Sequence, residues 1–551
     1  MTLNDVKLLF EFIGGLGMFL YGMNIMADGL QKAAGGRMKR MLGYMTDSRI
    51  LGILLGAVIT AIIQSSSATT VMVVGFVNAG ILSLSQAVGV IMGANIGTTV
   101  TAWIVSMSEW GEAMKPEFFA PVLIGVGAFF LLFAKKEKKQ EAGSILVGFG
   151  LLFVGLSFMS GAVKPYRDAP VFAEAFSVLG RNPIFGILAG IVVTAVIQSS
   201  SASVGILQTL AMNGVVNWNC AVYITLGQNI GTCVTALLAG AGAHRTARRA
   251  AVIHLLFNVI GAAFAGTVMF FLFQVNRGWA AAPVTSTQIS VFHTVFNVSN
   301  TILLFPFAGK LVSLSEKIVR EKKVKAEETK EQEILSHLDD RILENPSFAI
   351  ETAKREVVRM GMLALDTVKL GLQAVMDGSR EAVEKIFAQE KTINLMENSL
   401  TGYLVKVSNL SLMERQSEQV KNLLYTVSDL ERIGDHAENI AELAESKIQR
   451  EIRFSPMGQE DLKLIYSYAV GAVEHAVLAR KQEDVENIRE VIRFEDLVDS
   501  TEEELRDKHV ARLARYECLP ESGVIFLDII GNLERISDHA YNIAGYVKDE
   551  L

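Results

Sequence analysis

Two copies of one polar motif lie in the most apolar part of this chain and constrain its fold more than any other feature. The first copy is Gln64-Ser65-Ser66-Ser67, and the second, 134 residues later, is Gln198-Ser199-Ser200-Ser201. An Asn-Ile-Gly-Thr sequence follows each copy at the same offset, at residues 95–98 and 229–232. Hydroxyl and carboxamide groups at bilayer depth are costly unless they are partnered. A duplicated polar cluster in a duplicated apolar segment therefore predicts a two-fold binding site, as in secondary transporters.

Charge divides the chain into two parts. Residues 1–313 carry 19 Lys and Arg against 11 Asp and Glu, and the remainder carries 32 against 47, within a net charge of -7. A long apolar, weakly basic part followed by an acidic part predicts a membrane domain joined to a soluble domain. The acidic balance of the second part argues against nucleic-acid binding. We expect a membrane domain over 1–313, a charged linker over 314–334 and a soluble helical domain over 335–551.

Seven segments are apolar enough to cross a bilayer, which takes about 20 residues. They lie near residues 8–28, 86–107, 118–134, 143–163, 219–240, 247–274 and 288–313. Two further apolar segments, about 50–82 and 184–215, are interrupted by the Gln-Ser-Ser-Ser motifs, so each half is too short to cross. We expect two re-entrant helical hairpins, which are tolerated at depth where they are buried in protein or line a cavity.

Basic clusters predict how the segments are oriented. Clusters within residues 32–49, 135–139, 245–249 and 317–323 all fall on one side, which should be cytoplasmic. Three crossings separate the hairpins, so the second repeat (about 143–274) should be inverted relative to the first (about 8–134). Inverted repeats provide two related conformations with access exchanged, which is the geometry of alternating access. Membrane lipid is then an obligatory partner, and the soluble domain is expected to be cytoplasmic.

The site must use uncharged groups, because residues 50–108 and 182–243 contain no Asp, Glu, Lys or Arg. Broken helices add backbone amides, which bind anions, and backbone carbonyls, which bind cations. A charged anion in a neutral pocket needs compensating cations, which favours coupled anion–cation transport. Single Ser or Thr residues in membrane helices often serve packing alone, but two equally spaced copies favour ligand binding. The isolated intramembrane His254 and His293 are expected to serve packing.

The paired Gln-Ser-Ser-Ser and Gly-x-Asn-Ile-Gly-Thr motifs resemble those of the type II sodium–phosphate cotransporter family, in its bacterial branch, over roughly residues 8–313. The resemblance implies Na⁺-coupled symport of inorganic phosphate by alternating access, in a bacterial inner (plasma) membrane. It implies phosphate contacts from Gln64, Ser65, Ser66, Gln198, Ser199 and Ser200. We assign the Na⁺ ligands to oxygens of Ser67, Asn95, Thr98, Ser201, Asn229 and Thr232. Which residues bind phosphate and which bind Na⁺ is our own interpretation. Cys233 replaces Thr99 in the second copy, so a cation site using that hydroxyl is expected only in the first repeat.

A second duplication lies in the acidic part. Residues 430–440 are similar to residues 533–543, at an offset of 103, and earlier segments match more loosely. Periodic apolar positions and short connections predict a pair of antiparallel three-helix units. The duplicated pattern resembles the PhoU family of phosphate-signalling regulators.

Each copy places a Glu and an Asp four residues apart on one helix face: Glu431 with Asp435, and Glu534 with Asp538. The PhoU resemblance implies that these four carboxylates bind a metal cluster, often of iron or zinc. The alternative is a salt-bridged helix face, since an Arg follows each Glu directly.

The favoured interpretation is a Na⁺-coupled phosphate symporter with a PhoU-like domain that regulates it. One alternative is export of phosphate or transport of another oxyanion. Another is a membrane-bound phosphate sensor that signals to a cytoplasmic partner through the PhoU-like domain. We expect no enzyme, since the sequence shows no nucleophile–base constellation and no Gly-rich phosphate loop with Lys. Homo-oligomerisation is left open.

Overall fold

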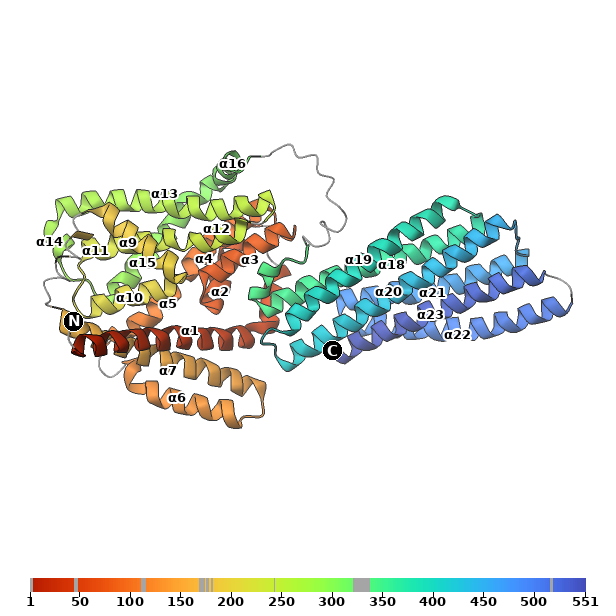
Figure 1. Cartoon of the computed structure of the whole chain (residues 1–551), viewed down its shortest axis with the longest axis horizontal. Coiled ribbons are helices and arrows are strands. Elements are labelled where there is room, and N and C mark those ends of the chain that lie inside the picture. Colours follow the sequence, from red (N-terminus) through yellow and green to blue (C-terminus); the bar gives the residue numbers. More distant parts are fainter. Residues whose placement is uncertain are drawn as a thin grey trace. The chain divides into compact units, whose positions relative to one another are not determined.

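The computed structural model describes residues 3–43, 48–110, 115–167, 174, 178–179, 182–241, 243–320, 337–515 and 519–551. Within these residues the chain forms helices and no β-strand, which confirms the expected all-α class. It divides into two compact units, Met1–Lys325 and Ala326–Leu551 (Figure 1). Residues 321–336, which include most of the expected charged linker, lie outside the described residues, as do the side chains of residues 35–43.

Seven helical segments in the described part of the first unit are long and apolar enough to cross a membrane, as expected. Three of them are single helices: α1 (Leu3–Gly43), α6 (Pro116–Phe133) and α13 (Arg245–Val275). The others are composite: α4 (Leu84–Gly97) with α5 (Thr99–Ser106) and η1 (Met107–Glu109), α7 (Glu137–Val163) with η3 (Lys164–Tyr166), α11 (Trp218–Gly231) with α12 (Cys233–Ala241), and α15 (Ser286–Leu304) with η4 (Phe305–Phe307) and α16 (Ala308–Ile318). The short helix α14 (Arg277–Ala281) lies in a connection.

Two helix pairs are broken at the polar motifs. α2 (Arg49–Ile63) and α3 (Ser66–Asn78) have 15 and 13 residues, and so do α9 (Pro183–Ile197) and α10 (Ser200–Met212). At 1.5 Å per residue the longer helix spans about 22 Å, less than the roughly 30 Å hydrocarbon core of a bilayer. These pairs are therefore hairpins too short to cross.

The two repeats are in register in the structure. Helices α9, α10 and α11 begin and end 134 residues after α2, α3 and α4. In both repeats a glycine lets the first helix of the hairpin (α2 or α9) contact the helix that comes after the hairpin (α4 or α11). A Cβ on Gly93 would lie 2.0 Å from the Ile53 carbonyl oxygen, and one on Gly227 would lie 2.0 Å from the Ile187 carbonyl oxygen. Each hairpin is thus held backbone against backbone on its own long helix.

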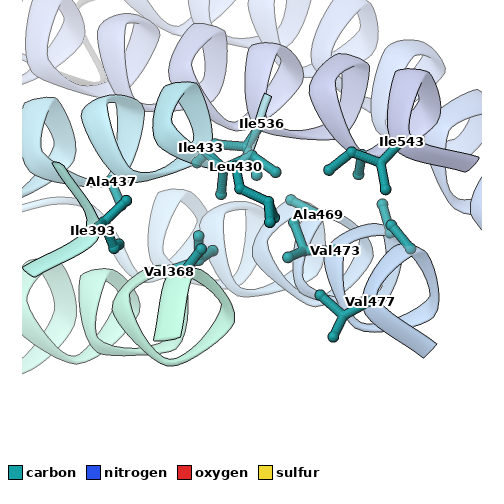
Figure 2. Close-up of a cluster of buried hydrophobic side chains, with 14 of the residues drawn as sticks. Val368, Ile393, Leu430, Ile433, Ala437, Ala469, Val473, Val477, Ile536 and Ile543 are labelled. Carbon is teal, nitrogen blue, oxygen red and sulfur yellow. The ribbon is translucent and has the colours of Figure 1, made fainter. Parts of the chain in front are cut away.

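The second unit is a helical bundle. η5 (Asp340–Glu344) precedes α18 (Pro346–Asp377), α19 (Arg380–Ser408), α20 (Glu414–Gln449), α21 (Pro456–Gln482), α22 (Val485–Ala514) and α23 (Pro520–Glu550). Helices α18–α20 pack together, α21–α23 pack together, and α20 packs against α23. Figure 2 shows the shared core, to which Val368 of α18, Ile433 of α20, Val473 of α21 and Ile536 of α23 contribute. These side chains are at most 1% exposed, so one apolar core joins the two three-helix groups.

Candidate functional site

The polar motif ends one helix and begins the next at each hairpin tip. Gln64 and Gln198 both have φ of 57°, the left-handed conformation that non-glycine residues rarely adopt. Ser65 then caps α3 by accepting a hydrogen bond from Ala68 N (3.1 Å), and Ser199 caps α10 by accepting one from Ala202 N (3.2 Å). The first backbone amides of α3 and α10 therefore lie at the tips, and the partial positive charge there suits an anion.

The two hairpin tips meet. Ser66 Oγ and Ser200 Oγ, which are 134 residues apart in the chain, lie 3.4 Å from each other, and both side chains are buried. Ser201 Oγ donates to the backbone oxygen of Gln64 at 3.4 Å. The duplicated motif is thus gathered into one neutral cluster of hydroxyls and helix N-termini.

The segment after the first hairpin adds hydroxyls to this cluster. Thr98 Oγ1 donates to Ser66 Oγ at 3.0 Å, and Thr101 Oγ1 donates to Gln64 Oε1 at 2.9 Å. The amides of Asn95 and Asn229 donate one helical turn back, to the Ile91 and Thr225 carbonyls at 2.8 and 2.9 Å. Those bonds fix each carboxamide against its own helix.

The two halves differ despite their identical motifs. Gln64 is 6% exposed, and its amide also donates to the Ala61 carbonyl, whereas Gln198 is exposed. The residue equivalent to Thr101 is Thr235, which donates to the Thr232 carbonyl of its own segment at 2.9 Å. The first tip is therefore closed around its Gln side chain, and the second tip is open.

Several predicted site residues meet at the tips, but not all of them. Hydrogen bonds join Gln64, Ser66, Thr98, Ser200 and Ser201 across segments. Thr232 donates to Gln228 in its own helix at 2.9 Å, unlike its counterpart Thr98. Sequence analysis missed Thr101, although its position one turn after Thr98 on the same helical face is a usable signal.

Gln208 is a second residue that the sequence analysis missed. Its side chain is fully buried, and its Nε2 donates to the Ala102 carbonyl, the Ser286 carbonyl and Ser290 Oγ at 3.0, 3.2 and 2.9 Å. It therefore joins the second hairpin to α5 and α15. A Gln in the apolar run of α10 was the available signal.

In the soluble unit, three carboxylates lie close enough to hold one metal ion. Oxygens of Glu495 and Asp499 on α22 and of Asp538 on α23 lie within 4.8 Å of one another. Burial raises the pKa of Asp538, and the Asp499 carboxylate raises it further. Burial likewise raises the pKa of Glu534, followed by the effects of Asp538 and Asp499. Oxygen ligands of this kind suit a cation that relieves their mutual repulsion.

The first three-helix group has a weaker version of this cluster. Glu431 and Asp435 each lie 3.8 Å from the Arg432 guanidinium, as the salt-bridge alternative expects. Burial raises the pKa of Glu390 on α19, and nearby carboxylates, Asp435 among them, raise it further. Asn394 occupies the place that Asp499 has in the second group, so this cluster has one carboxylate fewer.

Comparison with known families identifies both parts of the chain. The model of the Na⁺/Pi-cotransporter family matches residues 18–161 and 169–318, more than half of the chain. The chain belongs to the Na⁺/Pi-cotransporter family. The PhoU domain model matches residues 357–444 and 462–547, one match for each three-helix group. The resemblance drawn from the motifs is confirmed, and this member of the cotransporter family is a phosphate-transporter relative that carries a PhoU domain.

Individual relatives share this architecture to different extents. The putative inorganic phosphate export protein YjbB of Escherichia coli (strain K12) is 25% identical over 545 residues, 98% of this chain and 98% of YjbB. The uncharacterized protein YqeW of Bacillus subtilis (strain 168) is 32% identical over 302 residues, 55% of this chain and 95% of YqeW. The sodium-dependent phosphate transport protein 2A of Ovis aries is 35% identical over 116 residues, 20% of this chain and 17% of that protein.

Proposed function

We propose that this cotransporter-family member moves inorganic phosphate together with Na⁺ and that the joined hairpin tips hold the phosphate. The observation that carries the proposal is the 3.4 Å contact between Ser66 Oγ and Ser200 Oγ. It brings two helix N-termini and several hydroxyls to one point, and these are the donors that a tetrahedral oxyanion needs. Gln64, Ser65, Gln198 and Ser199 complete the proposed phosphate contacts.

Na⁺ would compensate the phosphate charge in this neutral cluster. The hydroxyl and carboxamide oxygens of the adjacent segments are suitable ligands for a small, hard cation. The proposed ligands are Ser67, Asn95, Thr98, Ser201, Asn229 and Thr232. The family description and the sodium-dependent relative support coupling to Na⁺.

Alternating access would follow from an inverted pair of repeats in a bacterial inner membrane, with the soluble unit in the cytoplasm. The basic clusters support this orientation, and the unequal burial of Gln64 and Gln198 supports a conformation with one tip closed. Each repeat would close in turn over the same phosphate.

Export is the second candidate, and one observation favours it. YjbB, which is related along nearly its whole length, is named as a putative inorganic phosphate export protein. The same site can serve either direction, because the Na⁺ and phosphate gradients set the direction of net flux. Efflux from phosphate-loaded proteoliposomes under an inward Na⁺ gradient, which would drive a symporter toward uptake, would support export.

The PhoU domain would adjust transport, and its Glu431, Asp435, Glu534 and Asp538 carboxylates would contribute to an iron or zinc site. The grouping of Asp538 with Glu495 and Asp499 supports a cation at the second three-helix group. Metal analysis of the purified protein, compared with an Asp538→Asn variant, tests this part of the proposal.

The main test is uptake of radiolabelled phosphate into proteoliposomes with and without an inward Na⁺ gradient. Wild type is compared with Gln64→Ala/Gln198→Ala, and Gln140→Ala serves as a control on an exposed part of α7. We expect Na⁺-dependent uptake that the double variant loses and the control keeps. Phosphate binding without Na⁺-driven flux would instead support the sensor alternative.

A further inference from the structure

A third repeat links two helices outside the hairpins. Residues 254–259 of α13 read His-Leu-Leu-Phe-Asn-Val, and residues 293–298 of α15 read His-Thr-Val-Phe-Asn-Val. Helix α13 packs against α11 and α12 of the second repeat and against α3 and α4 of the first. Helix α15 packs against α4 and α5 of the first repeat and against α10 and α11 of the second. The helices α3, α4 and α5 of the first repeat correspond to α10, α11 and α12 of the second. The neighbours of α15 are therefore the counterparts of the neighbours of α13, so α13 and α15 are equivalent in the same two-fold arrangement as the hairpins.

Both motifs contain buried polar atoms that have no hydrogen-bond partner among the described residues. His254, Asn258 and Asn297 are 0% exposed, and His293 is 2% exposed. Each Asn amide donates one turn back: Asn258 Nδ2 to the His254 carbonyl at 3.1 Å, and Asn297 Nδ2 to the His293 carbonyl at 2.9 Å. Within the described part of the chain, both Asn Oδ1 atoms, both ring nitrogens of His254 and Nδ1 of His293 have no hydrogen-bond partner. Buried acceptors normally have a partner, so these atoms indicate a ligand.

The α13 motif lies next to a segment already proposed to bind Na⁺. Asn258 Nδ2 is 3.3 Å from Cys233 Sγ, and that sulfur is 3.6 Å from the Asn229 carbonyl oxygen. The α15 motif lies beside α5 of the first repeat, because Trp103 Nε1 of α5 donates to Thr294 Oγ1 of the motif at 2.9 Å. Each motif therefore lies beside the helix that follows one Asn-Ile-Gly-Thr segment, α12 for the α13 motif and α5 for the α15 motif.

The chemistry of the unpaired atoms selects the ligand. Carboxamide oxygens and neutral imidazole nitrogens accept hydrogen bonds or bind cations, and no Asp, Glu, Lys or Arg occurs in residues 250–276 or 278–309. A carboxamide oxygen cannot donate a hydrogen bond to an anion, whereas oxygen atoms of this kind are ligands for hard cations such as Na⁺.

We propose that the two motifs bind Na⁺, with Asn258 Oδ1 and Asn297 Oδ1 as ligands in two equivalent positions. The inference rests on the proposed Na⁺-coupled transport and adds two oxygens to its cation sites. The sequence analysis expected His254 and His293 to serve packing, and the inference instead has them line the proposed Na⁺ positions.

Equilibrium binding of ²²Na⁺ to the purified full-length protein without phosphate tests the inference. Asn258→Leu and Asn297→Leu should each raise the half-saturating Na⁺ concentration by about tenfold or more, because one charge-assisted contact is lost. Asn258→Asp and Asn297→Asp supply a carboxylate oxygen and should retain Na⁺ binding. Asn213→Leu is the matched control, since Asn213 Nδ2 makes the same one-turn bond, to the Thr209 carbonyl at 2.8 Å.

The outcomes separate the inference from the proposed function. Wild-type protein that binds no Na⁺ overturns both. Wild-type binding that the Leu variants leave unchanged overturns the inference alone. If the Leu variants fail to fold, the Asp variants decide: a changed half-saturating Na⁺ concentration supports the inference, because the charge of a ligand has changed, and an unchanged one overturns it.

Discussion

The hydroxyl of Thr101 is expected to hold the first hairpin tip closed. Thr101 Oγ1 donates to Gln64 Oε1 at 2.9 Å, and Gln64 is only 6% exposed. A Thr101→Val substitution keeps the shape of the side chain and leaves this buried acceptor unpaired. The loss of such a bond costs about 1–3 kcal/mol. Because the Gln64 amide keeps its bond to the Ala61 carbonyl, we expect the lower part of this range, about 1–2 kcal/mol, which is a factor of roughly 5–30.

The free energy lost with this hydrogen bond should raise the phosphate concentration that gives half-maximal transport. Thr101→Val is expected to raise the phosphate concentration for half-maximal transport roughly 5- to 30-fold at saturating Na⁺. The reason is that part of the phosphate-binding free energy must then be used to close the first hairpin tip. The measurement is Na⁺-driven uptake of radiolabelled phosphate into proteoliposomes over a range of phosphate concentrations. The matched control is Thr235→Val, where the hydroxyl donates to the Thr232 carbonyl rather than to a tip glutamine. Equal changes in the two variants, or no change in Thr101→Val, would refute the reasoning.

Three further predictions concern packing, access and charge. Gly93→Leu should destabilise the folded protein by about 3 kcal/mol or more, because the new side chain would clash with a backbone carbonyl of α2. Thermal unfolding measures this loss, and the control Gly125→Leu, at a position with open space around it, should change the unfolding temperature little. In a background without native cysteines, Gln198→Cys should react with a small, membrane-impermeant thiol reagent at least about tenfold faster than Gln64→Cys, since only position 198 is exposed; equal rates would contradict the difference between the tips. Burial and the Asp499 carboxylate raise the pKa of Asp538, so its contribution to stability is present at acidic pH and is lost as the pH rises through its raised native pKa. Asp538→Asn should therefore raise the unfolding temperature in calorimetry at neutral pH without metal and should weaken stabilisation by added Zn²⁺; a lower unfolding temperature without metal would oppose this explanation.

Local sequence was enough to predict the helix pattern of the membrane unit. The apolar runs on either side of Gln64 and Gln198 are too short to cross a bilayer, and the serine that follows each Gln is a strong helix cap. The structure places the hairpin breaks at these residues, with the same φ of 57° at both. Helix lengths and ends depend on residues near one another in the chain, so a single sequence carries them.

Partners of the site residues could not be predicted in the same way. Thr101 was missed because its hydroxyl matters only when α5 lies beside the tip of the first hairpin. Asp538 was expected to act with Glu534, and the structure adds Glu495 and Asp499 on α22, a different helix, as close carboxylate neighbours. The packing of side chains from distant segments decides both contacts.

The sequence by itself determined the two repeats, their common offset and the helix break at each Gln-Ser-Ser-Ser motif. Only the tertiary structure decided that Gln64 is buried while Gln198, in an identical motif, is exposed. It also decided that α13 and α15 are equivalent although their motifs are 39 residues apart rather than 134. The physical reason is that capping and backbone conformation are set by neighbours along the chain, whereas burial and pairing are set by whichever segments fold against a side chain.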